Sequence, residues 1–153
     1  MNKARKVFTV VELIAAAGIV AIVAAVAVPV YSGIEQKVRG TAAIGDMGRI
    51  EIAIAKFLTK GNGALPANLA AVGLDTLNDP WGNPYRYLNI EATRDTGIEA
   101  VRKNRNLMPI NSDYDLYSMG KDGKSKSPLT ARESKDDIVR AANGAYLGLA
   151  GDF

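Results

Sequence analysis

Acidic side chains near the C-terminal third of this 153-residue chain form its best candidate ion site. Asp122 lies in a glycine-flanked loop, and Asp136 and Asp137 follow the polar stretch 123–135. Hard cations such as Ca²⁺ bind several carboxylate and carbonyl oxygens at once and tolerate irregular geometry. Three lysines crowd the same loop: Lys121, Lys124 and Lys126. The pattern therefore leaves two interpretations open, a calcium loop and an exposed charged loop.

Glu12 is the second carboxylate in an unusual setting. It directly precedes Leu13–Val30, 18 residues without a charge or a hydroxyl group. A carboxylate inside a membrane helix costs about 2.5–3.5 kcal/mol on insertion scales, so it needs a partner or must reach the interface. One interpretation is that Glu12 lies at the interface. The other is a positive charge from another chain, which cleavage after Val7 would create as the free ammonium of Phe8.

Composition excludes several classes of function. The chain has no cysteine and no histidine, which rules out cysteine zinc sites, cysteine nucleophiles, disulfides and a histidine base. The net charge of +3 comes from the first seven residues, because the remaining 16 basic residues equal the 16 acidic ones. We therefore expect no nucleic-acid partner. Asp113 and Asp115 are interpreted as solvated charges at a strand edge rather than acid–base catalysts, and no enzyme activity is expected.

Three interpretations fit the basic start and the apolar stretch that follows it. The first is a secretory signal peptide, for which Ala25-Val26-Ala27 supplies a small-x-small cleavage site. The second is a permanent transmembrane anchor, because 18 helical residues span about 27 Å of a bilayer core about 30 Å thick. Basic residues before the anchor would then stay in the cytoplasm. The third is a precursor cut before Phe8, and it alone gives Glu12 a partner.

The third interpretation agrees with a family resemblance. "FTVVEL", followed by an apolar run that ends in "AVAVP", resembles the N-terminal signature of type IV pilins and pseudopilins, with Glu12 fifth and Pro29 twenty-second from Phe8. The resemblance implies that a prepilin peptidase cuts between Val7 and Phe8 and methylates Phe8. It also implies that Glu12 pairs with the amine of a neighbouring subunit in a helical filament. The peptidase strongly prefers glycine before the cut, so Val7 is expected to slow or block cleavage.

A second resemblance narrows the family. "LPANLAAVGL", "NDPWGNPYRY", "YDLYSMGKDGK" and "KDDI" are similar to segments of the major pseudopilin of type II secretion. This likeness implies a calcium site with the Met119 carbonyl, Asp122 and Asp137 as ligands, and Asp136 as a further candidate. The stretch 91–112 and the final residues match the pattern least. The polar loop 123–135 is also longer than the corresponding loop of that family.

The resemblance implies a structural subunit of a type II secretion pseudopilus, which would help export folded proteins. Its expected partners are further copies of itself, minor pseudopilins, prepilin peptidase, and an inner-membrane assembly platform with its ATPase. We expect a single pass through a bacterial inner membrane, with the C-terminal domain in the periplasm. A type IV pilin of a surface fibre, used for adhesion, motility or DNA uptake, is the alternative. A secreted or membrane-anchored enzyme with a conventional signal peptide is a third class.

The predicted fold is α+β, a long N-terminal helix packed on a small antiparallel sheet. Residues 1–7 are expected to be a leader, 8–30 a membrane and filament-core helix, and 31–153 a periplasmic or extracellular domain. Pro29 is expected to kink or locally open the helix, which then resumes with one apolar stripe to the stop signal at Gly61. Strands are predicted at 85–90, 114–120 and 146–149. The stretch 91–112 is expected to be a loop or partial hairpin, 120–137 an exposed loop, and the segment from 137 a short helix.

Overall fold

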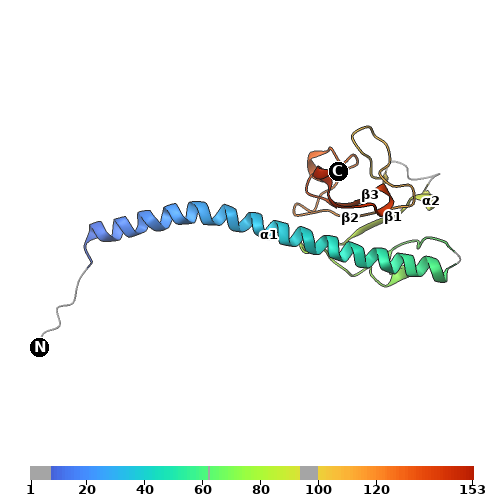
Figure 1. Cartoon of the computed structure of the whole chain (residues 1–153), viewed down its shortest axis with the longest axis horizontal. Coiled ribbons are helices and arrows are strands. Elements are labelled where there is room, and N and C mark those ends of the chain that lie inside the picture. The colour runs from blue at the N-terminus through green and yellow to red at the C-terminus, as the bar shows by residue number, and fades with distance from the viewer. Residues whose placement is uncertain (1–7, 62, 94–99) are drawn as a thin grey trace, which may run out of the picture. The chain divides into compact units, whose positions relative to one another are not determined.

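Figure 1 presents the computed structural model of the chain, which describes residues 8–61, 63–93 and 100–153. These residues form two compact units, one ending at Lys37 and the other comprising Val38–Phe153. In chain order the elements are α1 (Val10–Lys60), η1 (Leu69–Val72), β1 (Arg86–Asn89), α2 (Ile90–Thr93), β2 (Tyr114–Ser118), η3 (Arg132–Ser134), β3 (Ile138–Ala141), η4 (Ala142–Gly144), β4 (Tyr146–Leu149) and η5 (Ala150–Asp152).

The helix α1 contains 51 residues and runs through both units. It ends where the sequence predicts, since Lys60 is its last residue and the amide of Gly61 donates to the Phe57 carbonyl over 2.8 Å. Residues 25–28 stay helical, so the helix is not interrupted before Pro29, and a kink at Pro29 stays a prediction. Proline removes a single backbone donor, and the neighbouring turns keep their helical geometry.

The N-terminal half of α1 leaves its large apolar side chains in solvent. From Val10 to Val30 these side chains are 58–75% exposed, and none of the most apolar 18-residue window is buried. This helix is long and apolar enough to cross a membrane. Full burial of one such side chain contributes about 1.5–3 kcal/mol, so the segment has a large unused capacity for burial in lipid or against other helices.

The second unit has a four-stranded antiparallel sheet in the order β1-β2-β3-β4. The predicted strands at 85–90, 114–120 and 146–149 correspond to β1, β2 and β4. The prediction of a short helix from residue 137 is wrong, because this segment forms the strand β3. All four residues of β3 are buried, with Ile138 in one core cluster and Val139 and Ala141 in another. Burial on both faces removes the alternation by which a strand is recognised.

The core lies between the C-terminal half of α1 and the sheet. Ala43, Met47, Ile50 and Ile54 recur at helical spacing and are at most 1% exposed. Met47, Ile50 and Ile54 belong to the apolar stripe that the sequence predicts. They pack in one cluster with sheet residues such as Leu116 and Ile138. The α+β prediction of a long helix packed on a small antiparallel sheet is therefore confirmed. The aromatic side chains of Trp81, Tyr85 and Tyr87 also join this cluster.

Candidate functional site

The start of α1 is closed by a reciprocal pair of hydrogen bonds between Thr9 and Glu12. The Glu12 Oε2 atom accepts from the Thr9 amide and the Thr9 hydroxyl, both at 2.8 Å. In return the Glu12 amide donates to Thr9 Oγ1 over 3.2 Å. This arrangement is a capping box, which satisfies amide groups that have no partner inside the helix. The sequence pattern Thr-x-x-Glu at residues 9–12 is the local signal for this motif.

Phe8 and Glu12 are both exposed at this end of the chain. The Phe8 side chain is 82% exposed. Both hydrogen bonds from Thr9 reach the same Glu12 oxygen, and Oε1 accepts none from the described residues. Glu12 can therefore keep its cap while Oε1 faces a donor from outside the chain. Val7, the other half of the expected cleavage site, lies outside the described residues.

The expected calcium ligands lie in a loop whose two ends meet. Gly120 has φ +61°, and a Cβ atom there would lie 2.2 Å from the Asp136 carbonyl oxygen, so only glycine fits this crossing. The Asp122 amide donates to Asp136 Oδ2 over 3.1 Å. Asp122 is itself exposed, and its Oδ1 accepts from the Lys124 amide. The fold thus brings Asp122 and Asp136 together through backbone contacts rather than as two free carboxylates.

Asp137 is buried and paired with Arg102, a residue that the sequence analysis did not single out. Arg102 Nη2 donates to Asp137 Oδ2 over 2.6 Å, and the two side chains are 3% and 0% exposed. Arg102 also lies over the Tyr117 ring, 4.5 Å from its centroid. Burial raises the pKa of Asp137 to about 6, while hydrogen bonding by Ser125 and the positive charge of Arg102 act in the opposite direction. No local sequence motif predicts this pair, because 35 positions separate the two residues.

These residues do not fit a calcium site as they stand. Calcium requires six to eight oxygen ligands, and nowhere in the described ranges do three or more acidic side chains gather in a suitable group. A guanidinium already contacts Asp137 Oδ2. The one feature in favour of a ligand is Asp137 Oδ1, which is buried and has no hydrogen-bond partner among the described residues. Calcium binding through Met119, Asp122 and Asp137 stays a prediction.

Asp113 and Asp115 are also not the solvated pair expected from the sequence. Asp115 is 1% exposed, and its oxygens accept from the Arg102 amide at 2.7 Å and from Asn111 Nδ2 at 2.9 Å. Asp113 is half-buried and binds Arg140 through both oxygens. The two carboxylates therefore have separate structural partners.

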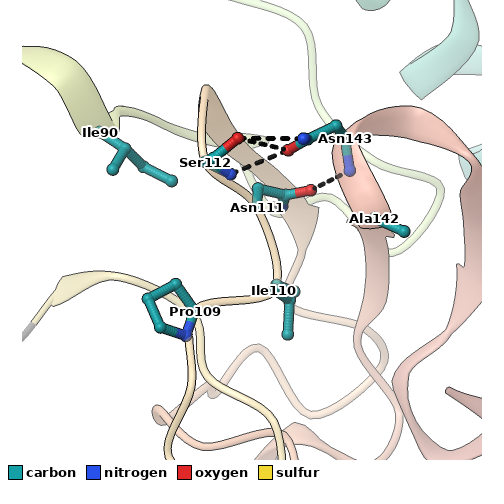
Figure 2. Close-up of a pocket in the computed structure, with 7 residues that line it drawn as sticks. All are labelled: Ile90, Pro109, Ile110, Asn111, Ser112, Ala142 and Asn143. Atoms are coloured by element: carbon teal, nitrogen blue, oxygen red, sulfur yellow. Dashed lines mark hydrogen bonds between the residues drawn. The ribbon is translucent and has the colours of Figure 1, made fainter.

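An open cavity of about 380 Å³ lies beside η4. Figure 2 shows that Ser112 and Asn143 bond to each other at its rim, where Ser112 also donates its amide to Asn143 Oδ1 over 2.8 Å. Its lining contains no titratable side chain: Ile90, Pro109, Ile110, Asn111, Ser112, Ala142 and Asn143. The cavity offers hydrogen bonds and one hydroxyl, that of Ser112, but its lining has no acidic or basic side chain that could activate this hydroxyl as a nucleophile.

Comparison with known proteins adds no relative. A scan against models of protein families, a search of curated proteins and a search of solved structures each give no significant match.

Proposed function

We propose that the protein is a structural subunit of a helical filament, a type II secretion pseudopilus, and assembles through the N-terminal half of α1. The observation that carries the proposal is an apolar helix half, exposed along its whole length, with Glu12 in its first turn. The chain would be anchored in the inner membrane by this helix, with its C-terminal domain in the periplasm. It would leave the membrane by packing this helix against those of other subunits.

The composition of the helix supports close packing. Small side chains recur along it, at Ala15 to Ala17, Ala24, Ala25 and Ala27, and small residues allow membrane helices to approach closely. Lipid and neighbouring helices are both able to cover the exposed apolar surface. The same helix can therefore serve first as an anchor and then as the core of a filament.

Glu12 would set the register between subunits. Cleavage after Val7 would leave an ammonium group on Phe8, and the Glu12 carboxylate of an incoming subunit would pair with it. A charge buried without its partner is costly, so misaligned subunits would be disfavoured. The capping box supports this role because it fixes Oε2 on Thr9 and leaves Oε1 for the incoming amine.

The first experiment is the intact mass and N-terminal residue of the membrane-extracted chain, expressed with and without a prepilin peptidase. The proposal predicts a chain that starts at Phe8 only when the peptidase is present, heavier by one methyl group. A chain starting at Val28 would indicate an ordinary signal peptide and overturn the proposal. An unprocessed chain beginning at Met1 would show that Val7 blocks the cut, and the assembly assay would then use Val7→Gly.

The second experiment separates the charge of Glu12 from its capping role. Glu12→Gln keeps a side chain that can complete a capping box but removes the negative charge, whereas Glu12→Ala removes both. We expect both variants to remain folded and membrane-bound and to form few or no filaments in a reconstituted secretion system. Normal filaments from Glu12→Gln would contradict the pairing of carboxylate and ammonium.

A further inference from the structure

We propose that the guanidinium of Arg102 takes the place of a metal ion and holds the loop 119–137 closed. This inference concerns the C-terminal unit alone and does not depend on filament assembly. It assigns a positioning role to a residue in the 91–112 stretch, where the resemblance to pseudopilins is weakest. It predicts a subunit whose loop is stable without calcium.

Arg102 reaches two parts of the loop at once. Its Nη2 donates to Asp137 Oδ2 at the loop's end, and its Nη1 donates to the Lys126 carbonyl near the middle over 2.9 Å. Ser125 Oγ donates to the same Asp137 oxygen. One planar cation thus joins a backbone carbonyl and a carboxylate, the two ligand types that a calcium ion would join in such a loop.

The backbone beside Arg102 forms a brace along the same part of the loop. Ser127 Oγ donates to the Val101 carbonyl over 2.8 Å, and the Leu129 amide donates to the Lys103 carbonyl over 2.8 Å. Residues 101–103 therefore contact the loop on both sides of Arg102 as well as through it. The guanidinium is held at a fixed place rather than carried on a mobile surface side chain.

Charge and burial oppose a second cation at this position. Arg102 is 2% exposed, and a guanidinium carries a permanent positive charge. A calcium ion bound to Asp137 would lie against this permanent positive charge in a site that excludes solvent, where repulsion is weakly screened. The unpartnered Asp137 Oδ1 offers a single oxygen, far short of a calcium coordination sphere.

The test uses thermal melting of the full chain in nonionic detergent, followed by Trp81 fluorescence. Trp81 is the single tryptophan, and it lies two residues from Asn83, whose Nδ2 donates to the Gly120 carbonyl over 2.9 Å. Its emission therefore reports on the start of the loop. Melting is compared in millimolar calcium and in a chelator, for the unmodified chain and for Arg102→Gln, Asp137→Asn and the double variant. Arg105→Gln is the matched control, because it removes one arginine charge from an exposed position in the same segment.

We expect the unmodified chain to melt at the same temperature with calcium and with chelator. Arg102→Gln should lower the melting temperature by at least about 10 °C, whereas Arg105→Gln should change it by no more than about 2 °C. The double variant should lose less than the sum of the two single losses, because removing both charges leaves no unpaired ion.

Three results would overturn the proposal. The first is a melting temperature of the unmodified chain that rises with calcium. The second is the same melting temperature for Arg102→Gln and Arg105→Gln. The third is a decrease in melting temperature of the double variant that equals the sum of the two single decreases. If Arg102→Gln does not fold at all, the calcium comparison on the unmodified chain still decides, together with Arg102→Lys, which keeps the charge but loses the planar fork.

Discussion

Arg140 on β3 donates from Nε to Glu51 Oε1 on α1 over 2.7 Å, although 89 positions separate the two residues. The same guanidinium binds both oxygens of Asp113 at 2.8 Å and lies 3.9 Å from the centroid of the Tyr114 ring. Arg140 is only 4% exposed. One side chain therefore ties the C-terminal half of α1 to the sheet and to the loop before β2.

Replacing Arg140 by methionine should destabilise the C-terminal unit by about 3 kcal/mol, because two carboxylates would lose their shared cation. This loss lies at the low end of the range for breaking a buried ion pair, because the side chains of Glu51 and Asp113 are 23% and 34% exposed. Urea denaturation in detergent, followed by Trp81 fluorescence, measures the change. Arg49→Met is the control, because Arg49 is 79% exposed in its pair with Asp46 and should lose less than about 1 kcal/mol. Equal losses in the two variants would show that Arg140 adds no more than a surface pair.

Two isoleucines on the same helix give a direct test of the packing of α1. Ile54 is 1% exposed and Ile52 is 57% exposed. Ile54→Ala should reduce the free energy of unfolding by about 2–5 kcal/mol, because it leaves a cavity in the core. Ile52→Ala should stay within about 0.5 kcal/mol of the unmodified chain. A large loss from Ile52→Ala in the monomer would mean that the exposed face of this helix is wrongly identified.

Removal of the Thr9 hydroxyl should loosen the first turn of α1. Thr9→Val loses the oxygen that accepts from the Glu12 amide, at a cost of about 1 kcal/mol for the helix start. The Glu12 and Leu13 amides donate to the Thr9 hydroxyl oxygen and to the Thr9 carbonyl. Their hydrogen exchange in micelles should accelerate about fivefold for this cost. Thr9→Ser keeps the hydroxyl and serves as the control. Unchanged exchange in Thr9→Val would contradict the capping box.

Asp115 should make the C-terminal unit lose stability as the pH rises. Burial raises the pKa of Asp115 above its ordinary value of 3.8, although hydrogen bonds from Asn111 and the Arg102 amide act against this rise. An acid with a raised pKa in the folded state binds more protons folded than unfolded. Its stabilising contribution is therefore complete below pH 3.8 and is lost as the pH rises through the folded-state pKa.

Urea denaturation at a series of pH values above 3.8 measures this contribution. Asp115→Asn cannot titrate, so the difference in unfolding free energy between the unmodified chain and the variant should change with pH in this direction. The variant's altered hydrogen bonding adds an offset that does not depend on pH. A difference that stays constant across the series would show that the pKa of Asp115 is the same in the folded and unfolded states.

Local signals predicted α1 and three of the four strands correctly. The three- and four-residue spacing of Met47, Ile50 and Ile54 identified the buried face of α1, and Gly61 marked its end. Turn residues on either side of the strands located β1 and β2. Local patterns failed at β3, where both faces are buried, and at Asp115, which was interpreted as a solvated charge. The environment of β3 comes from segments distant in the chain. The partners of Asp115 come from the preceding irregular stretch, at Arg102 and Asn111, where no periodic pattern signals their contact.

The sequence by itself determined an apolar helix half that needs lipid or other helices. It also determined a carboxylate at the start of this helix and an α+β unit that follows in the chain. These properties follow from composition and spacing within a few helical turns or one strand. Tertiary structure alone decided the partners of the buried charges, Arg102 with Asp137 and Arg140 with Glu51, which lie 35 and 89 positions apart. Pairs so distant meet only when the whole unit packs. The free energy of a buried charge depends on which opposite charge that packing brings within hydrogen-bond distance.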